Sequence, residues 1–357
     1  MNVAGMTHSP LVEEPGHLGL ELGNFRPVGV RGFGDPQNNY AHSMAWFKDC
    51  LYVGTSRNSL WLIQRRGKVA PPPEMECWPV QFPEPMPMDE MCAEIWRYDP
   101  RSDEWARVFK SPLGERDGQP FPRDLGYRGM LVYQGRSDPE PALYVAGISG
   151  SGMNLMRSVD GVNWEVVGEP GLGDPRMVSA RSMLEWRGRI YVTPVGAMGK
   201  TPNETDVPVI LESDDPAGGR WREVCLPGFG DDTNKAVADL VVFEDHLYAA
   251  TLNPTCGFQL YKTKARGEPP YRWTRVLSAG AYRGYLNEGV AHMCVFKVAI
   301  YLGTGIEGGG YNRWHQIGPA AAEVIRVHAD DTWDLIVGMP RLSPSGLKPP
   351  LSGLGPG

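Results

Sequence analysis

The sequence has few of the features that mark membrane, secreted or nucleic-acid-binding proteins. No apolar run is long enough to cross a bilayer, and the first residues contain no basic segment followed by an apolar one. Lysine and arginine total 35 against 42 aspartate and glutamate, so the net charge of −7 offers no positive field for a polyanion. We therefore expect no nucleic acid, no membrane partner and a cytoplasmic location, although a cleaved signal peptide would leave no trace.

Cysteine is scarce and its spacing is uninformative. The chain has 6 cysteines, with no CxxC pair and no Cys/His cluster of zinc-binding spacing. Cys50, Cys225 and Cys294 stand in or beside apolar runs, where a free cysteine behaves as a small buried residue. We predict no disulfide framework, and no motif requires a cofactor.

A tryptophan-centred phrase dominates what is present. It recurs every 52 to 60 residues as DEWARV, VNWEVV, GRWREV, YRWTRV and DTWDLI, around Trp105, Trp164, Trp221, Trp273 and Trp333. A second phrase precedes each copy: LYVGT, LYVAG, IYVTP, LYAAT and IYLGT, around Tyr52, Tyr144, Tyr191, Tyr248 and Tyr301. The 44 glycines and 33 prolines suit many tight turns. Repeats of this length, built from short strands, predict an all-β fold arranged as a toroid of sheets.

The predicted architecture is a single β-propeller domain of four-stranded antiparallel blades. Five blades are visible, at about 41–110, 127–168, 180–226, 236–278 and 289–338. The first strand of each copy is almost continuously apolar (SMAWF, GMLVY, SMLEW, DLVVF, HMCVF), as expected for an inner strand buried on both faces.

The turns between third and fourth strands carry a family resemblance. In the second copy this turn reads RSVDGVNW over 157–164, where Asp-Gly suits a tight hairpin. It resembles the Asp-box and kelch-like turns of β-propellers and is one residue shorter than the usual Asp box. Together with the LYVGT phrase, it is similar to a largely uncharacterised bacterial β-propeller family. The resemblance covers about 25–340 and implies a fold but no catalytic residues.

The two ends of the repeat region leave ring closure open. RPVGVRGFGDP, from Arg26, matches REVCLPGFGDD, from Arg222, so residues 25–30 are expected to form an outer-strand stub ahead of the first blade. Either five blades close the ring with a spare strand, or the chain is a shortened form of a six- or seven-bladed ring. We hypothesise the second arrangement.

Function in a propeller is expected at one mouth of the central channel, where the starts of first and third strands and the ends of second strands meet. This placement selects three catalytic candidates: Arg181, Asp239 and His292. The ligand-binding candidates are His42, Arg57, Glu94, Arg128, Asn253, Glu307 and Glu323. Arginines can orient an anionic ligand, and His292 or Asp239 can move a proton. The alternative is that these groups bind water and neighbouring loops, as polar channel linings do in any propeller.

The insertion at 56–93 is the largest departure from the repeat. It lies over the expected functional mouth and could form a lid or a protein-binding arm. Met86, Met88, Met91 and Cys92 offer soft sulfur ligands of the kind that hold Cu(I), whereas the alternative is that the methionines pack the loop onto the blades.

The sequence therefore predicts binding of a small anionic or polar ligand, or a peptide, at the channel mouth. Acid/base chemistry of the lyase, hydrolase or alkyl-transfer type is compatible with the candidate residues, and whether the protein is an enzyme stays open. The alternative is a non-catalytic propeller that binds carbohydrate or protein.

Overall fold

The computed structural model describes residues 21–59, 61, 82–196, 203–306, 310–312 and 314–338. These residues form five four-stranded antiparallel blades. Blade 1 contains β1 (Asn38–Phe47), β2 (Cys50–Arg57), β3 (Glu94–Asp99) and β4 (Glu104–Lys110). Blade 2 contains β7 (Gly126–Tyr133), β8 (Ala142–Ile148), β9 (Leu155–Ser158) and β10 (Glu165–Val167). Blade 3 contains β11 (Met177–Trp186), β12 (Arg189–Gly196), β13 (Leu211–Ser213) and β14 (Arg222–Glu223). Blade 4 contains β15 (Ala236–Phe243), β16 (His246–Leu252), β17 (Leu260–Thr263) and β18 (Thr274–Leu277). Blade 5 contains β19 (Gly289–Phe296), β20 (Ala299–Gly305), β21 (Val324–His328) and β22 (Trp333–Val337).

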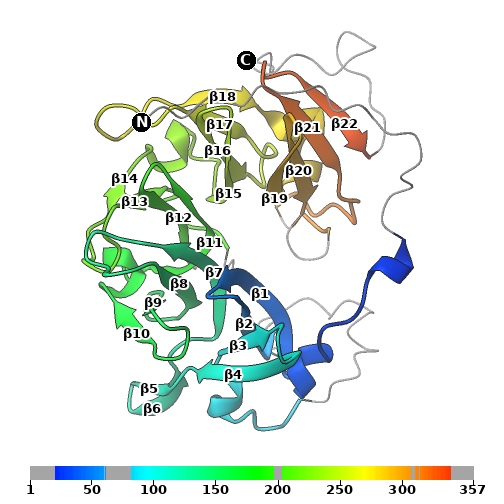
Figure 1. The fold of residues 1–357 in the computed structure, drawn as a ribbon. Helices are drawn as coiled ribbons and strands as arrows, with labels where there is room; N and C mark the ends of the chain where they lie inside the picture. The colour runs from blue at the N-terminus through cyan, green and yellow to red at the C-terminus, as the bar shows by residue number, and fades with distance from the viewer. Residues whose placement is uncertain are drawn as a thin grey trace.

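The blades follow one another around a central channel (Figure 1). Each pairs its strands in sequence order, and the innermost strands β1, β7, β11, β15 and β19 lie side by side along the ring. The predicted all-β propeller is confirmed. None of the helices in the described part of the chain is long and apolar enough to cross a membrane.

The core lies between blades rather than within them. We call the side of a blade toward the next blade its following face and the other side its preceding face. Tyr52 and Phe47 on the following face of blade 1 pack in one cluster with Met130 and Trp164 on the preceding face of blade 2. In blades 1 to 4, the buried tyrosine of the LYVGT phrase therefore supports the blade that comes after it.

The Asp-Gly turn of blade 2 shows why its residues are needed. The Asp160 carboxylate accepts hydrogen bonds from the amides of Val162 (2.8 Å) and Asn163 (2.7 Å), which holds its pKa well below the usual range. Gly161 has a φ of +78°, and a Cβ there would lie 1.9 Å from the Tyr52 hydroxyl oxygen. Glycine is required both for the backbone conformation and for the close approach of the neighbouring blade.

The Gly-rich phrases ahead of the inner strands form one repeated loop. Short helical turns occur at η2 (Arg31–Gly34), η4 (Pro170–Gly173), η5 (Pro227–Gly230) and α3 (Ala279–Tyr282). In each, a glycine and the residue after it have positive φ: Gly32 and Phe33, Gly171 and Leu172, Gly228 and Phe229, Gly280 and Ala281. Blade 2 has a hairpin in this place, β5 (Leu113–Arg116) with β6 (Gln119–Pro122), which the repeat pattern did not predict.

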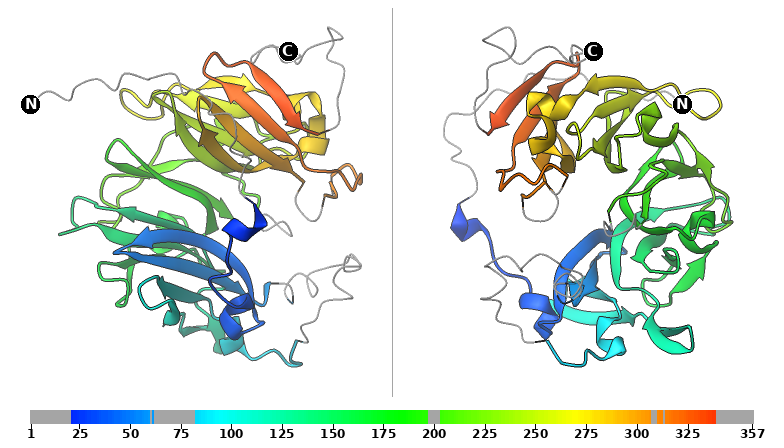
Figure 2. Two further views of the ribbon diagram at one scale, coloured as in Figure 1. Left: turned by 45° about the vertical axis from the view of Figure 1, so that its right-hand side comes forward. Right: turned by 180° about the vertical axis from the view of Figure 1, so that it is seen from behind.

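The described ring is open between blade 5 and blade 1, as both views of Figure 2 show. The extended segment 26–30 lies at this opening against blade 1, where the Trp105 indole donates a hydrogen bond to the Val28 carbonyl at 2.6 Å. Trp273 of blade 4 donates in the same way to Val224 beside β14 at 2.9 Å. Residues 26–30 thus occupy the place of a preceding blade's outer strand, although they form no ladder with another described strand.

The remaining short helical turns are η1 (Leu22–Asn24), η3 (Met88–Met91) and η6 (Gly284–Asn287).

Candidate functional site

Each innermost strand carries a β-bulge at the equivalent place near its start. The register shifts between Ala41 and Ser43, Tyr127 and Gly129, Ala180 and Met183, Val237 and Asp239, and Val290 and His292. A bulge leaves a residue outside the ladder and re-aims its side chain. The residues inside the bulges are His42, Arg128, Arg181 with Ser182, Ala238 and Ala291. Blades 1 to 3 therefore present basic side chains at this level of the channel, whereas blades 4 and 5 present alanine.

The three basic bulge residues interact with one another. Burial, and then the positive charges of Arg128 and Arg181, lower the pKa of His42 to about 4. His42 is therefore neutral at physiological pH. Its Nδ1 atom is buried and has no hydrogen-bond partner among the described residues. An unsatisfied buried nitrogen is costly, so this atom suits a water or a ligand group.

Both arginines are half-buried and reach toward the next blade. The Arg128 guanidinium donates to the Asn203 side-chain oxygen at 2.7 Å, and Arg181 Nε donates to the Ala238 carbonyl at 3.4 Å. Arg181 therefore contacts the bulge of blade 4 at Ala238, the residue immediately before Asp239. Sequence reasoning did not identify Asn203, because its loop has no counterpart in the other copies.

Asp239 and His292 form an ion pair across blades 4 and 5. His292 Nδ1 lies 3.0 Å from Asp239 Oδ2, and this hydrogen bond raises the pKa of His292. Asp239 is buried, with its side chain 6% exposed, whereas the imidazole is 80% exposed. A buried carboxylate thus holds an accessible imidazole in one orientation, which is the geometry of a general acid/base.

Asp239 also ties neighbouring blades together. Its Oδ2 accepts from the Met293 amide at 2.6 Å, as Ser182 Oγ accepts from the Leu240 amide at 3.3 Å. At the same position of blade 1, Ser43 Oγ donates to the Tyr127 carbonyl at 2.7 Å. Asp239 therefore makes the inter-blade hydrogen bond that Ser182 also makes, and in addition it contacts His292.

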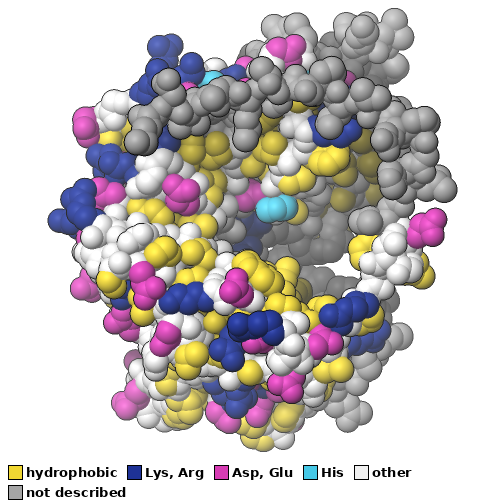
Figure 3. Space-filling model, viewed as in Figure 1, with side chains coloured by type: hydrophobic (Ala, Val, Ile, Leu, Met, Phe, Trp, Pro, Cys, Tyr) yellow, Lys and Arg dark blue, Asp and Glu magenta, His cyan; other side chains and the backbone are white. Residues whose placement is uncertain are grey.

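Figure 3 shows one face of the molecule, hollowed at the centre of the ring, with a histidine side chain at the rim of the hollow.

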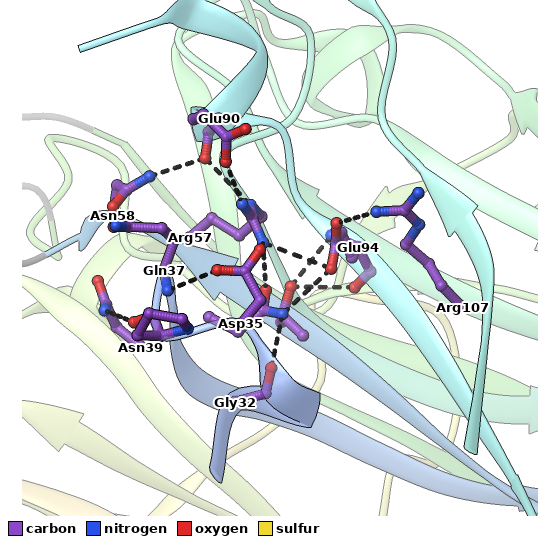
Figure 4. A network of polar contacts seen from close by, with 12 residues as sticks. Gly32, Asp35, Gln37, Asn39, Arg57, Asn58, Glu90, Glu94 and Arg107 are labelled. Carbon is purple, nitrogen blue, oxygen red and sulfur yellow. Dashed lines mark hydrogen bonds and ion pairs between the residues drawn. The ribbon is translucent and has the colours of Figure 1, made fainter. Parts of the chain in front are cut away.

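Arg57 and Glu94 lie in a different environment, a dense polar network at the start of blade 1 (Figure 4). The Arg57 side chain is 1% exposed and donates to Asp35 at 2.7 Å and to Glu90 at 2.6 Å. Glu94 accepts from Asn38 at 3.1 Å and from Trp96 at 2.9 Å, and it pairs with Arg107 at 2.8 Å. These bonds join the Gly-rich loop ahead of β1, which we call its lead-in loop, to β2, η3 and β3. Both side chains therefore help to hold the blade together.

The same arrangement recurs in blades 4 and 5, where it includes two more ligand candidates. Asn287 bridges the Gly280 carbonyl (3.0 Å) and Glu323 (2.7 Å), just as Asn38 bridges Gly32 (3.0 Å) and Glu94. Asn253, which is fully buried, donates to Thr233 at 2.8 Å and accepts from the Cys256 amide at 2.8 Å. Asn253 and Glu323 therefore hold the Gly-rich loops ahead of β15 and β19 in place, through Thr233 and Asn287. Glu307 lies outside the described residues.

The sulfur-rich end of the insertion packs inward. Met86, Met91 and Cys92 are buried and Met88 is half-buried. Burial raises the pKa of the Cys92 thiol to about 11, whereas copper requires the thiolate. Within the described residues, no group of His, Cys, Asp or Glu side chains is arranged to hold a metal ion.

A hollow of about 300 Å³ lies away from the channel, at the hairpin end of blade 4. Its lining includes His246, Lys262, Lys264, Arg266 and Arg272. Lys262 is already paired with Asp331 at 2.5 Å and Arg266 with Asp245 at 3.6 Å. Internal ion pairs thus compensate part of its charge.

No protein-family model matches the sequence, and no curated protein matches it. Solved structures resemble it at low identity. The chain from the nidogen/laminin complex is 12% identical, with a TM-score of 0.44 over 82% of this chain and 78% of that one. A GH74 enzyme of Niastella koreensis is 12% identical, with a TM-score of 0.45 over 84% of this chain and 38% of that one.

A glycoside hydrolase family 43 arabinoxylan arabinofuranohydrolase of Bacillus subtilis, solved with cellotetraose, is 10% identical. Its TM-score is 0.42, over 84% of this chain and 67% of that one. Identities this low concern the fold alone.

Proposed function

We propose that the channel mouth binds a small anionic ligand, such as a carboxylate, between Arg128, Arg181 and His292. The observation that carries this proposal is the repeated bulge, which in blades 1 to 3 holds His42, Arg128 and Arg181 close enough for both arginines to lower the pKa of His42. Guanidinium groups bind carboxylates through charge-assisted hydrogen bonds. The unsatisfied Nδ1 atom of His42 adds a neutral hydrogen-bonding group beside them.

The Asp239–His292 pair supports acid/base chemistry on such a ligand. The imidazole is accessible, oriented by a buried carboxylate and raised in pKa, so it can give a proton to the ligand and take one back. General acid/base catalysis of this kind is compatible with lyase, hydrolase and alkyl-transfer reactions.

A non-catalytic carbohydrate- or protein-binding propeller is the alternative. Such a module would offer similar residues in each repeat, whereas the bulge positions here carry His, Arg, Arg, Ala and Ala. This asymmetry favours one site on one side of the channel.

Free thiols support a reducing, cytoplasmic compartment, which we include in the proposal. The cysteines that the structure describes, Cys50, Cys92, Cys225, Cys256 and Cys294, are free, and the last two are exposed.

The test is binding of acetate, succinate and inorganic phosphate, measured by calorimetry. We expect Arg181→Gln and Arg128→Gln each to weaken binding by about 10-fold or more, since a charged hydrogen bond contributes roughly 1.5–3 kcal/mol. Arg101→Gln is the matched control, because Arg101 is exposed and pairs with Asp99 at 3.0 Å on a hairpin of blade 1. Equal affinity of the wild type and both channel variants would contradict the proposed site.

A further inference from the structure

The following face of blade 5 is bare where the same face of the other blades is covered. Phe296 is 58% exposed, whereas its counterparts Phe47, Tyr133 and Phe243 are 4%, 6% and 5% exposed and Trp186 of blade 3 is half-buried. Tyr301 is half-buried, although the equivalent LYVGT tyrosines of blades 1 to 4 are almost fully buried. Cys294 on the same face is exposed.

The preceding face of blade 1 is bare in the complementary way. Met44 is 61% exposed, whereas Leu240 and Met293 at the same position of blades 4 and 5 are 5% and 3% exposed. Trp46, two residues along β1, is 57% exposed. Both faces of the opening thus carry apolar side chains of the kind that the inter-blade clusters bury elsewhere in the ring.

One strand of the element that would fill the opening is already in place. Trp105 holds Val28 by the same hydrogen bond that joins Trp273 to Val224 of blade 3. Phe33 also stacks on Trp96 at 4.9 Å, as Phe229 stacks on Tyr261 at 4.2 Å. Residues 26–30 therefore stand where the fourth strand of a further blade belongs, while the positions of its three inner strands are not filled by any described strand.

We propose that the opening between blades 5 and 1 is the docking site for a partner polypeptide that supplies three antiparallel strands. These strands would complete a blade whose outer strand is residues 26–30. The interface would continue the four inter-blade contacts that the structure already contains, from blades 1 and 2 to blades 4 and 5.

The chemistry of the partner follows from the two faces. Its sheet must be apolar on both sides, with one face to cover Phe296 and Tyr301 and the other to cover Met44 and Trp46. Its third strand must expose a free edge that can pair with residues 26–30. A second copy of this chain cannot supply such an edge. Its blade 5 already has a fourth strand, β22, and in the opening this strand would compete for the place that residues 26–30 hold.

The first measurement is the rate of maleimide reaction at Cys294 in the full chain. Cys50, Cys92 and Cys225 are buried, so Cys77→Ser and Cys256→Ser leave Cys294 as the accessible thiol among the described cysteines. We expect fast labelling at every protein concentration. Slow labelling at every concentration would show that the face is already covered, and slowing with rising concentration would show self-association. Either result would overturn the proposal.

The second measurement supplies three strands. The probe is a copy of residues 236–263, strands β15 to β17, with Cys256→Ser in the copy, joined to the full chain through a Gly/Ser linker that raises its effective concentration. We expect Cys294, and in a second background Met44→Cys, to react at least about 10-fold more slowly when the probe is present.

A matched probe controls for the linker. It carries Leu240→Asp and Phe243→Asp in the copied segment, which places a charge on each of its faces, and we expect no protection from it. Cys256, tested in its own background, should react at the same rate throughout if the ring stays folded. Equal rates at Cys294 with both probes would overturn the proposal.

Discussion

The imidazole of His292 in blade 5 lies 3.0 Å from the buried carboxylate of Asp239 in blade 4. The two residues are joined only because their inner strands are neighbours around the channel. The carboxylate stabilises the protonated imidazole, and the following predictions start from that coupling.

Asp239→Asn is expected to lower the pKa of His292 toward its usual value near 6.5, because the amide carries no negative charge. The measurement is an NMR titration of the imidazole. With its raised pKa, His292 contributes stability that is fully present below the unfolded pKa and is lost as pH rises through the folded pKa. Asp99→Asn, in blade 1, serves as the control and should leave the His292 titration unchanged.

Arg181→Gln is expected to raise the pKa of His42 from about 4, since it removes one of the two positive charges that disfavour the imidazolium. Burial is the larger cause, so the value should stay below 6.5. The same NMR titration measures it. An unchanged His42 titration would mean that Arg181 does not face His42 across the channel.

Acidification is expected to destabilise the protein through His42. Its folded pKa is depressed, so the unfolded chain takes up the proton first, and stability falls as pH drops from 6.5 to about 4. A shift of this size corresponds to roughly 3 kcal/mol, and solvent screening reduces the expected loss to about 2 kcal/mol. Urea unfolding at several pH values measures it, with His42→Gln expected to flatten the curve in this window.

Glu94→Ala is expected to destabilise the protein by roughly 3 kcal/mol without weakening ligand binding at the channel. The substitution leaves the buried Arg57 guanidinium with fewer acceptors and also removes the partner of Asn38 and Trp96. Urea unfolding and calorimetry separate the two effects. If the variant bound the ligand more weakly while its free energy of unfolding stayed unchanged, Glu94 would belong to the ligand site.

Phe243→Ala and Phe296→Ala form a matched pair for the opening. They stand at the same position of adjacent blades but are 5% and 58% exposed. We expect the first to cost about 3–5 kcal/mol and the second less than about 1 kcal/mol. Similar losses in urea unfolding would mean that Phe296 is covered in solution.

The fold followed from local pattern. The repeated Trp and LYVGT phrases identify strands, turns and blades, because alternation and turn chemistry are properties of adjacent residues. The similar phrases that begin at Arg26 and Arg222 also predict an outer strand at 25–30. In the structure, the carbonyls of Val28 and Val224 accept equivalent hydrogen bonds from the tryptophans of the following blades.

Only part of the candidate site could be predicted from the sequence. Arg128, Arg181, Asp239 and His292 stand at inner-strand starts, which are expected to meet at one mouth. Arg57, at a second-strand end, and Glu94, at a third-strand start, are expected at the same mouth but lie in a scaffold network. Loop position does not reveal whether a polar side chain has partners from other segments. The partners of Arg57 (Asp35, Asn38 and Glu90) all come from segments outside β2.

The sequence by itself determined the repeat, the blade order and the residue types available at each inner-strand start. Only the tertiary structure decided which of these act together. Bulges set the direction of His42 and Arg181, the contact between blades couples Asp239 to His292, and the open ring leaves Trp46 and Phe296 uncovered. The physical reason is that each of these features depends on a neighbouring blade, and no repeat encodes what its neighbour presents.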